Sequence, residues 1–123
     1  MTTPDELERQ HTLMTAAARY DQLRMQDTLG TLAAGDALEM LALGELLARK
    51  AGYGRQIGVR SARAAGATWT QIGAALGTAK QSAWEAHIRW IDEQATKHRR
   101  TGLVGMDADD EAVARSVAGP DAD

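Results

Sequence analysis

Apolar residues recur at spacings of three and four along the first third of the chain, which is the period of an amphipathic α-helix. Thr3-Pro4-Asp5-Glu6 predicts where this helix begins, because a capping threonine is followed by proline at the first helical position and by a glutamate. Such a face packs against another helix, either in the core of the same chain or in a dimer, where Asp21 and His11 would help to fix the register. We call this face the apolar stripe; it consists of Leu7, His11, Met14, Ala18, Asp21, Met25, Leu29 and Leu32.

Two further helices are expected before residue 66. Gly35 is expected to end the first helix, and Asp36 with Glu39 is expected to cap a second helix that runs to about Ala51. Gly52-Tyr53-Gly54 predicts a break, because glycine is a poor helix former and a good turn former. A third helix is expected from about Arg55 to Ala65.

Composition favours the same all-α class. Three Trp, two Tyr and no Phe leave the core to Leu, Ile, Met and Ala, which suits closely packed helices. The chain has no cysteine, so disulfides and cysteine-containing metal sites are excluded. The acidic start does not resemble a signal peptide, and no run approaches the roughly 18 apolar residues of a membrane span. We therefore expect a cytoplasmic protein without membrane contact.

The formal net charge of −3 conceals an uneven distribution. Residues 1–48 hold three basic and eight acidic side chains, residues 49–100 hold ten and three, and residues 101–123 hold one and six. A segment of net charge +7 between acidic flanks is typical of a phosphate-binding region, although a solvated basic face has the same composition. The basic run 97–100 would be a phosphate clamp or a set of cations at a helix C-terminus.

The acidic tail, residues 105–123, contains few large apolar residues and is expected to be disordered, with at most a transient helix through 111–117. An alternative is that the tail folds back on the basic region and competes with DNA. The expected architecture is a bundle of about four to five helices in a single domain, 1–104. Within it, residues 1–52 form a helical pair that is a candidate for dimerisation, and 55–100 hold the candidate DNA-binding region.

Residues 68–90 contain two short helical patterns joined by a glycine. Thr68 or Thr70 can cap the first helix, and Gly77 ends it, because only glycine readily adopts the left-handed conformation that the turn requires. Gly73 and Ala83 are small enough to let the two helices cross closely. A unit of this kind matches the helix-turn-helix, whose second helix enters the major groove of double-stranded DNA.

The run from Ala62 to Trp84, ARAAGATWTQIGAALGTAKQSAW, resembles the pattern AR-x-x-G-x-SW-x-x-I-[AG]-x-x-LG-x-S-[RK]-Q-x-A of small helix-turn-helix proteins common in actinobacteria. It is also similar to the promoter-reading helix-turn-helix of sigma-factor region 4. The resemblance covers residues 58–90 and implies that Lys80 and Gln81 reach bases. Thr78 stands where an aliphatic residue is usual and Ala79 where serine usually caps the recognition helix, so Thr78 is expected to supply the cap.

The predicted recognition helix, residues 79–90, carries side chains suited to base edges. A glutamine amide can pair with adenine, lysine can donate to guanine and glutamate can accept from cytosine, each match contributing roughly 1–3 kcal/mol of discrimination. Arginine and hydroxyl side chains nearby are better suited to phosphate, and for Trp84 core, groove and partner contacts are all open. The predicted DNA-binding residues are Thr70, Thr78, Lys80, Gln81, Ser82, Trp84, Glu85, Arg89, Arg60 and Arg63.

Past this motif, Ile88, Trp90 and Ile91 widen the apolar surface beyond what a two-helix crossing needs. The apolar stripe of the first helix, from the same chain or from a partner, is expected to cover it. These features predict a sequence-specific DNA-binding transcriptional regulator, homodimeric and associated with the nucleoid. The alternative is a protein-interaction module that docks on a sigma factor, polymerase or another regulator.

Catalysis is not indicated. His11, His87 and His98 show no metal-ligand spacing, no glycine-rich phosphate loop follows a strand, and no serine lies in a nucleophile-elbow context. No metal and no cofactor is expected.

Overall fold

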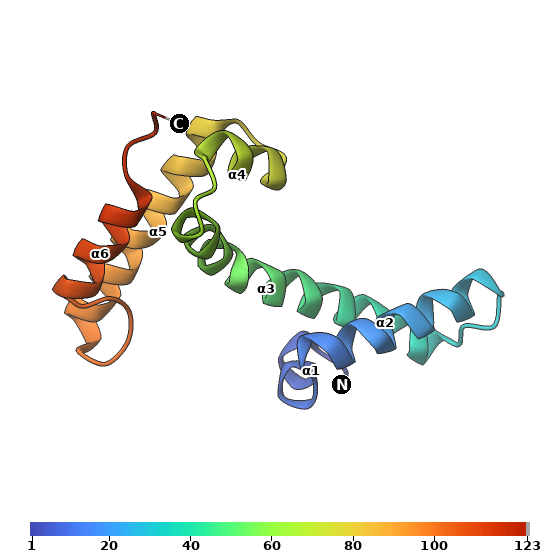
Figure 1. Ribbon diagram of the computed structural model, residues 1–123. Coiled ribbons are helices and arrows are strands. Elements are labelled where there is room, and N and C mark those ends of the chain that lie inside the picture. Colours follow the sequence, from blue (N-terminus) through green and yellow to red (C-terminus); the bar gives the residue numbers. More distant parts are fainter. Residues whose placement is uncertain (123) are drawn as a thin grey trace. The chain divides into compact units, whose positions relative to one another are not determined.

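All regular secondary structure in residues 1–122, the part of the chain that the computed structural model describes, is α-helical (Figure 1). The predicted all-α class is confirmed. Contacts within the chain divide it into two compact units, of which the first is Met1–Gly54 and the second begins at Arg55. The helices of these described residues are α1 (Pro4–Gln10), α2 (Leu13–Thr28), α3 (Ala34–Ala64), α4 (Trp69–Leu76), α5 (Lys80–Thr101) and α6 (Ala108–Ala118).

The core of the first unit lies between α2 and the N-terminal part of α3. Leu23 of α2 is completely buried against Leu43 and Leu46 of α3. Arg19 of α2 also donates to Glu39 of α3 at 2.9 Å, and this ion pair raises the pKa of Arg19 and lowers that of Glu39. The two helices are therefore joined by an apolar contact and by a charged hydrogen bond.

The N-terminal helix begins at the predicted place but is shorter than expected. Thr3 caps it by accepting a hydrogen bond from the Glu6 amide, and Pro4 occupies the first helical position. The prediction that it continues as one helix is wrong, because α1 ends at Gln10. Thr12 and Thr15 then form a reciprocal capping box, which satisfies backbone amides at the start of α2 and favours a new helix there.

Most of the apolar stripe does not form the core of this chain. Met14 is 78% exposed, Met25 62% and Leu29 70%, and for these residues the intramolecular prediction is wrong. The buried residues of α2 are Ala16 and Leu23, which lie on the opposite side of a helix with 3.6 residues per turn. α2 thus has two apolar faces, and periodicity alone does not say which of them packs on α3.

The predicted helix break at Gly52-Tyr53-Gly54 is also wrong, since α3 is continuous from Ala34 to Ala64. A glycine inside a helix costs about 1 kcal/mol relative to alanine, which is a preference and not a prohibition. A long run of helix-forming residues on both sides offsets a penalty of this size.

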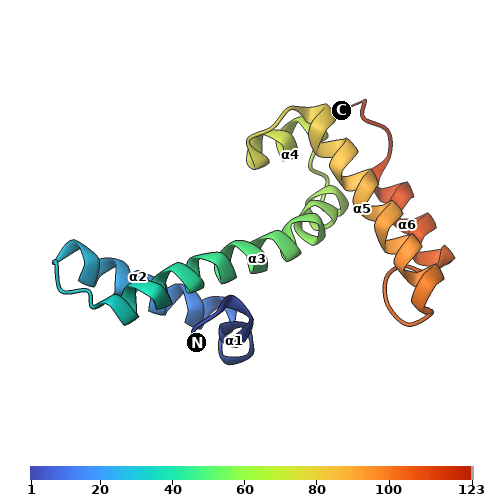
Figure 2. The ribbon, with the colours of Figure 1, turned by 180° about the vertical axis from the view of Figure 1, so that it is seen from behind.

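The core of the second unit is formed by residues of α3, α4, α5, α6 and the segment before α6. α4 packs on α5, and α6 lies alongside α5 on another side (Figure 2). Trp69 and Ile91 are completely buried at the centre of this core. The cluster consists of Val59, Trp69, Ile72, Ala83, Ile91, Met106, Ala114 and Ala118.

α6 contradicts the expected disorder of the acidic tail. The Asp107 side chain caps its N-terminus by accepting from the Asp110 amide, and the first turn carries Asp109, Asp110 and Glu111, where acids are favoured by the helix dipole. Its buried residues are alanines, which allow close approach to α5. A segment poor in large apolar residues can therefore still form a packed helix, because buried alanines are enough for close contact.

Three side chains hold the C-terminal end of α6. The Arg63 Nε donates to the carbonyl oxygens of Val117 and Ala118 at 3.2 and 3.1 Å. The Trp69 indole N–H also donates to the Ala118 oxygen at 2.9 Å, and that of Trp84 donates to the Gly119 oxygen at 2.8 Å. These donors come from α3, α4 and α5, so one cluster of hydrogen bonds ties α6 to the other three helices. We call these contacts the α6 anchor.

A completely buried histidine lies in the same core. The imidazole of His87 is stacked on Trp90 and tilted against Trp69, and its Nδ1 lies 2.9 Å from Gln56 Oε1. Because an amide oxygen only accepts, Nδ1 carries the proton, and Nε2 has no hydrogen-bond partner among the described residues. Burial lowers the pKa of His87 to about 4, and the positive charge of Arg60 acts in the same direction.

This histidine should make the second unit sensitive to acid. Below about pH 6.5 the unfolded chain binds a proton that the folded chain does not accept until about pH 4, so stability is lost as the pH falls through this range. The loss should reach on the order of 3 kcal/mol. Urea unfolding followed by tryptophan fluorescence at several pH values measures it. The His87→Gln variant should have a flatter profile, and parallel profiles for the two proteins would contradict the prediction.

Candidate nucleic-acid interface

α4 and α5 are joined by a short turn of the predicted kind. Gly77 adopts φ 72° and ψ 27°, in the left-handed region, and its amide donates to the Ala74 oxygen. The Thr78 amide donates to the Gly73 oxygen at 2.9 Å, and α5 starts at Lys80. These dihedral angles confirm the left-handed conformation that was predicted for Gly77.

Gly73 allows the turn to lie close to α4. A Cβ atom at this position would lie 2.9 Å from the Thr78 oxygen and 3.1 Å from the Lys80 nitrogen, and both of these are backbone atoms that have little room to move. α4 itself is capped by Thr68, in a reciprocal box with Gln71. The start of α4, its end and its contact with the turn are thus all fixed by short-range interactions.

The N-terminus of α5 has no side-chain cap. Its N-cap residue is Ala79, and the hydroxyl of Thr78 donates to the Ala79 oxygen instead of accepting from an amide of the first turn. The expectation that Thr78 supplies the cap is therefore wrong. Alanine offers no acceptor, so no side chain of the described residues satisfies the first-turn amides of α5.

Four of the predicted DNA-binding residues are exposed together on the first turns of α5. Gln81, Ser82, Glu85 and Arg89 lie on the side opposite the buried positions of this helix. The Gln81 amide donates to Glu85 Oε1 at 3.0 Å, so these two side chains are oriented by each other. Lys80, at the first position of α5, is half-buried next to them. Arg89 has no carboxylate partner within the described residues.

Thr70 and Thr78 complete the polar surface near this end of α5. Thr70 is exposed in the first turn of α4, and Thr78 is exposed in the turn between the helices. Their predicted contacts with phosphate stay predictions.

The remaining predicted residues have contacts inside the protein. The indole of Trp84 is part of the α6 anchor, and so is the guanidinium of Arg63, which also lies over the Trp69 ring at 5.5 Å. The Arg60 guanidinium lies over the ring of Trp90 at 5.8 Å. These contacts give the three side chains partners inside the protein, and the DNA contacts predicted for them stay untested.

The wide apolar surface of α5 is covered differently from the prediction. Ile88, Trp90 and Ile91 pack in the cluster that includes Met106 and Ala114, from α6 and the segment before it. The expectation that the apolar stripe of the first helix covers this surface is wrong for the single chain. The helix that covers it, α6, lies in the segment that the composition indicated to be disordered.

The acidic end of α6 lies near basic residues of α5. Glu111 is 4.0 Å from Arg99 and 2.7 Å from Arg115, which also pairs with Asp92 of α5. The pKa of Arg115 is raised by its hydrogen bonds to these carboxylates. The tail thus folds back on α5, while its predicted competition with DNA stays untested.

Other kinds of site are not found in the part of the chain described. Among residues 1–122, no group of three or more His, Cys, Asp or Glu side chains is arranged to hold a metal ion. None of the helices there is long and apolar enough to cross a membrane.

A cavity of about 650 Å³ beside α5 was not anticipated from the sequence. Its lining side chains, among them Trp90, Gln94 and Asp110, come from helices that are separate in the sequence and share no motif. Only the packing of α6 on α5 brings them together.

Comparisons of the chain with models of protein families, with curated proteins and with solved structures find no match.

Replacing Gly73 by alanine should destabilise the second unit. The added methyl would contact backbone atoms of the turn, and overpacking of this kind costs about 1–3 kcal/mol. Gly58→Ala is the matched control, because a Cβ at that helical position meets nothing within 4 Å and should stabilise the helix by about 0.5–1 kcal/mol. Urea unfolding followed by tryptophan fluorescence measures both; a Gly73→Ala variant as stable as the wild type would refute the close approach.

Proposed function

We propose that this protein binds double-stranded DNA in a sequence-specific manner and acts as a transcriptional regulator. The observation that carries the proposal is the group Gln81, Ser82, Glu85 and Arg89, exposed on one face at the start of α5. That helix follows a tight left-handed turn and packs across α4. In helix-turn-helix proteins this is the part of the second helix that meets base edges in the major groove.

The chemistry of the group suits base recognition. Gln81 can donate to and accept from the major-groove edge of adenine, and Glu85 can accept from cytosine. The hydrogen bond between these two side chains reduces the conformational freedom that binding would otherwise remove. Lys80 and Arg89, on either side of the pair, supply cations for guanine or for the backbone.

The uncapped start of α5 suits a phosphate of the DNA backbone. Amides of the first turn have no side-chain acceptor, and the helix dipole favours an anion there. The exposed hydroxyls of Thr70 and Thr78 lie in the first turn of α4 and in the turn before α5. Contacts of this kind would position α5 on the duplex without reading sequence.

DNA binding should depend strongly on salt. Affinity for random-sequence duplex should fall log-linearly with salt concentration. Arg89→Gln should weaken binding to all sequences and reduce the slope of log affinity against log salt concentration by about one.

Gln81→Ala should cost about 1–3 kcal/mol of binding free energy on the preferred site and relax specificity at one base pair. Fluorescence anisotropy with labelled duplexes, after selection of a site from random sequences, tests both.

Arg9→Gln is the control for charge, because this cation lies on α1 in the other unit. Its affinity should equal that of the wild type. Absence of duplex binding by the wild type at low salt would overturn the proposed function.

We further propose that two copies associate through the exposed part of the apolar stripe on α2. In an antiparallel pairing, Met14 of one copy would face Leu29 of the second copy, and Ala18 would face Met25, so that a large residue meets a small one near the two-fold axis. Such a pairing would bury Met14, Met25 and Leu29, which are exposed in the single chain. A two-fold dimer would suit paired half-sites on DNA.

Met25→Asp should convert the dimer into a monomer, because it would add two carboxylates to an interface that already has the two copies of Asp21 near its two-fold axis. Leu41→Asp is the control: Leu41 is 65% exposed on α3 and lies outside the stripe. Light scattering on a sizing column measures the mass of each variant. A wild-type protein that is monomeric at concentrations used for DNA binding would contradict this pairing.

A second candidate function is docking on a protein of the transcription machinery, such as a sigma factor, a polymerase or another regulator. Leu38 and Leu41 favour it, because they form an exposed apolar pair on α3 that the stripe does not include. A protein of this kind would show weak or no binding to duplex in the salt series.

A further inference from the structure

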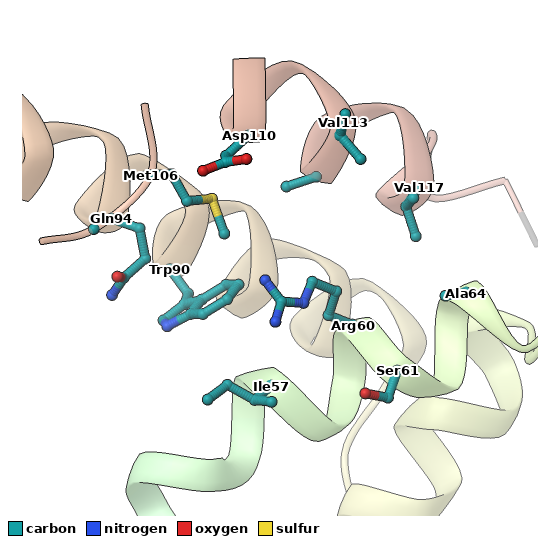
Figure 3. Close-up of a pocket in the computed structure, with 12 residues that line it drawn as sticks. Ile57, Arg60, Ser61, Ala64, Trp90, Gln94, Met106, Asp110, Val113 and Val117 are labelled. Carbon is teal, nitrogen blue, oxygen red and sulfur yellow. The ribbon is translucent and has the colours of Figure 1, made fainter. Parts of the chain in front are cut away.

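A cavity of about 650 Å³ opens beside α5 in the second unit. Arg60 and Ser61 line it from α3, Trp90 and Gln94 from α5, and Asp110 from α6, as Figure 3 shows. The volume falls within the range of small-molecule sites, roughly 300–1,000 Å³. The cavity is therefore large enough for a ligand of the size of a metabolite.

The walls of the cavity are mainly apolar and include a few polar side chains, of which Arg60 lies over the ring of Trp90 at 5.8 Å. Met106, Val113 and Val117 lie around the same space as the Trp90 ring. Arg60 and Asp110 have no ion pair within the described residues, although Arg19, Arg49 and Arg115 are all paired with carboxylates.

The tryptophans show the same contrast. The indole N–H groups of Trp69 and Trp84 donate to the carbonyl oxygens of Ala118 and Gly119 in the α6 anchor. The indole N–H of Trp90 donates to no atom of residues 1–122. The cavity thus combines a cation, an anion and an aromatic side chain whose indole N–H donates to no atom of residues 1–122. Apolar walls with a few polar groups of this kind are the usual composition of a ligand site.

We propose that this cavity binds a small aromatic carboxylate that also carries a hydrogen-bond donor, such as an amino or hydroxyl group. Arg60 would bind the carboxylate, because a guanidinium presents two parallel N–H donors to it. Asp110 would accept from the donor group of the ligand, which offsets the repulsion that a plain carboxylate would meet. The edge of Trp90 and the side chain of Met106 would contact the aromatic ring, because His87 is stacked on the indole and Arg60 lies over it.

This inference goes beyond the proposed DNA binding and does not depend on it. The cavity lies between α5 and α6, and α5 also carries the group of exposed residues at its start. A ligand held there would favour whichever arrangement of α5 and α6 it fits best, and only its role as an effector rests on the proposed function.

NMR spectroscopy of the full chain without DNA tests the proposal, since the three indole N–H signals report on different places. The probes are 3-hydroxybenzoate and 4-aminobenzoate, compared with benzoate, which lacks the donor, and phenol, which lacks the carboxylate. We expect the Trp90 signal, assigned with Trp90→Phe, to shift saturably with both donor-bearing acids, with a Kd in the millimolar range or tighter. The signals of Trp69 and Trp84 should move less.

Variants of the two charged residues separate a specific site from weak surface binding. Arg60→Gln should weaken binding of 3-hydroxybenzoate about tenfold. Asp110→Asn should weaken it as well, while strengthening the binding of benzoate, because a repulsive charge is removed. Arg55→Gln and Asp109→Asn, neighbours outside the cavity, are the matched controls and should keep the wild-type Kd.

Two results would overturn the proposal. One is the absence of a saturable Trp90 shift with either donor-bearing acid. The other is an unchanged Kd in both Arg60→Gln and Asp110→Asn, which would show that the probe binds elsewhere. Because no DNA is present, neither result bears on the DNA-binding proposal.

Discussion

The carbonyl groups at the C-terminal end of α6 hold the second unit together. A helix ends with carbonyl oxygens that have no partner within the helix, and its dipole makes that end negative. Arg63, Trp69 and Trp84 satisfy three of these oxygens from three different helices. Burying a guanidinium or an indole N–H without an acceptor is costly, so the position of α6 and those of α3, α4 and α5 depend on one another.

This arrangement gives α5 its two different sides. Ala83, His87 and Ile91 face the packed core, where α4 and α6 lie against α5. The remaining surface of its first turns is polar and carries Gln81 and Glu85. The proposed DNA-binding face is therefore what remains after α6 has covered the apolar side, and the cavity proposed as an effector site lies on the covered side.

In the first unit, one apolar side of α2 remains uncovered. α2 uses Ala16 and Leu23 to pack on α3 and leaves Met14 and Met25 exposed on its other side. Exposed apolar side chains grouped on one face are a common feature of surfaces where a second molecule binds. In the second unit, α6 covers the apolar side of α5 within the chain.

The sequence by itself determined the features that depend on a few neighbouring residues. These are the all-α class, the start of α1 at Pro4, and the left-handed Gly77 that leads into α5, because caps and turns are decided by local backbone geometry. Only the tertiary structure decided which helices pack on one another. It folded an acidic tail into α6. It also gave Arg63 and Trp84 partners inside the protein and formed the cavity around Trp90, since each depends on contacts between residues distant in sequence.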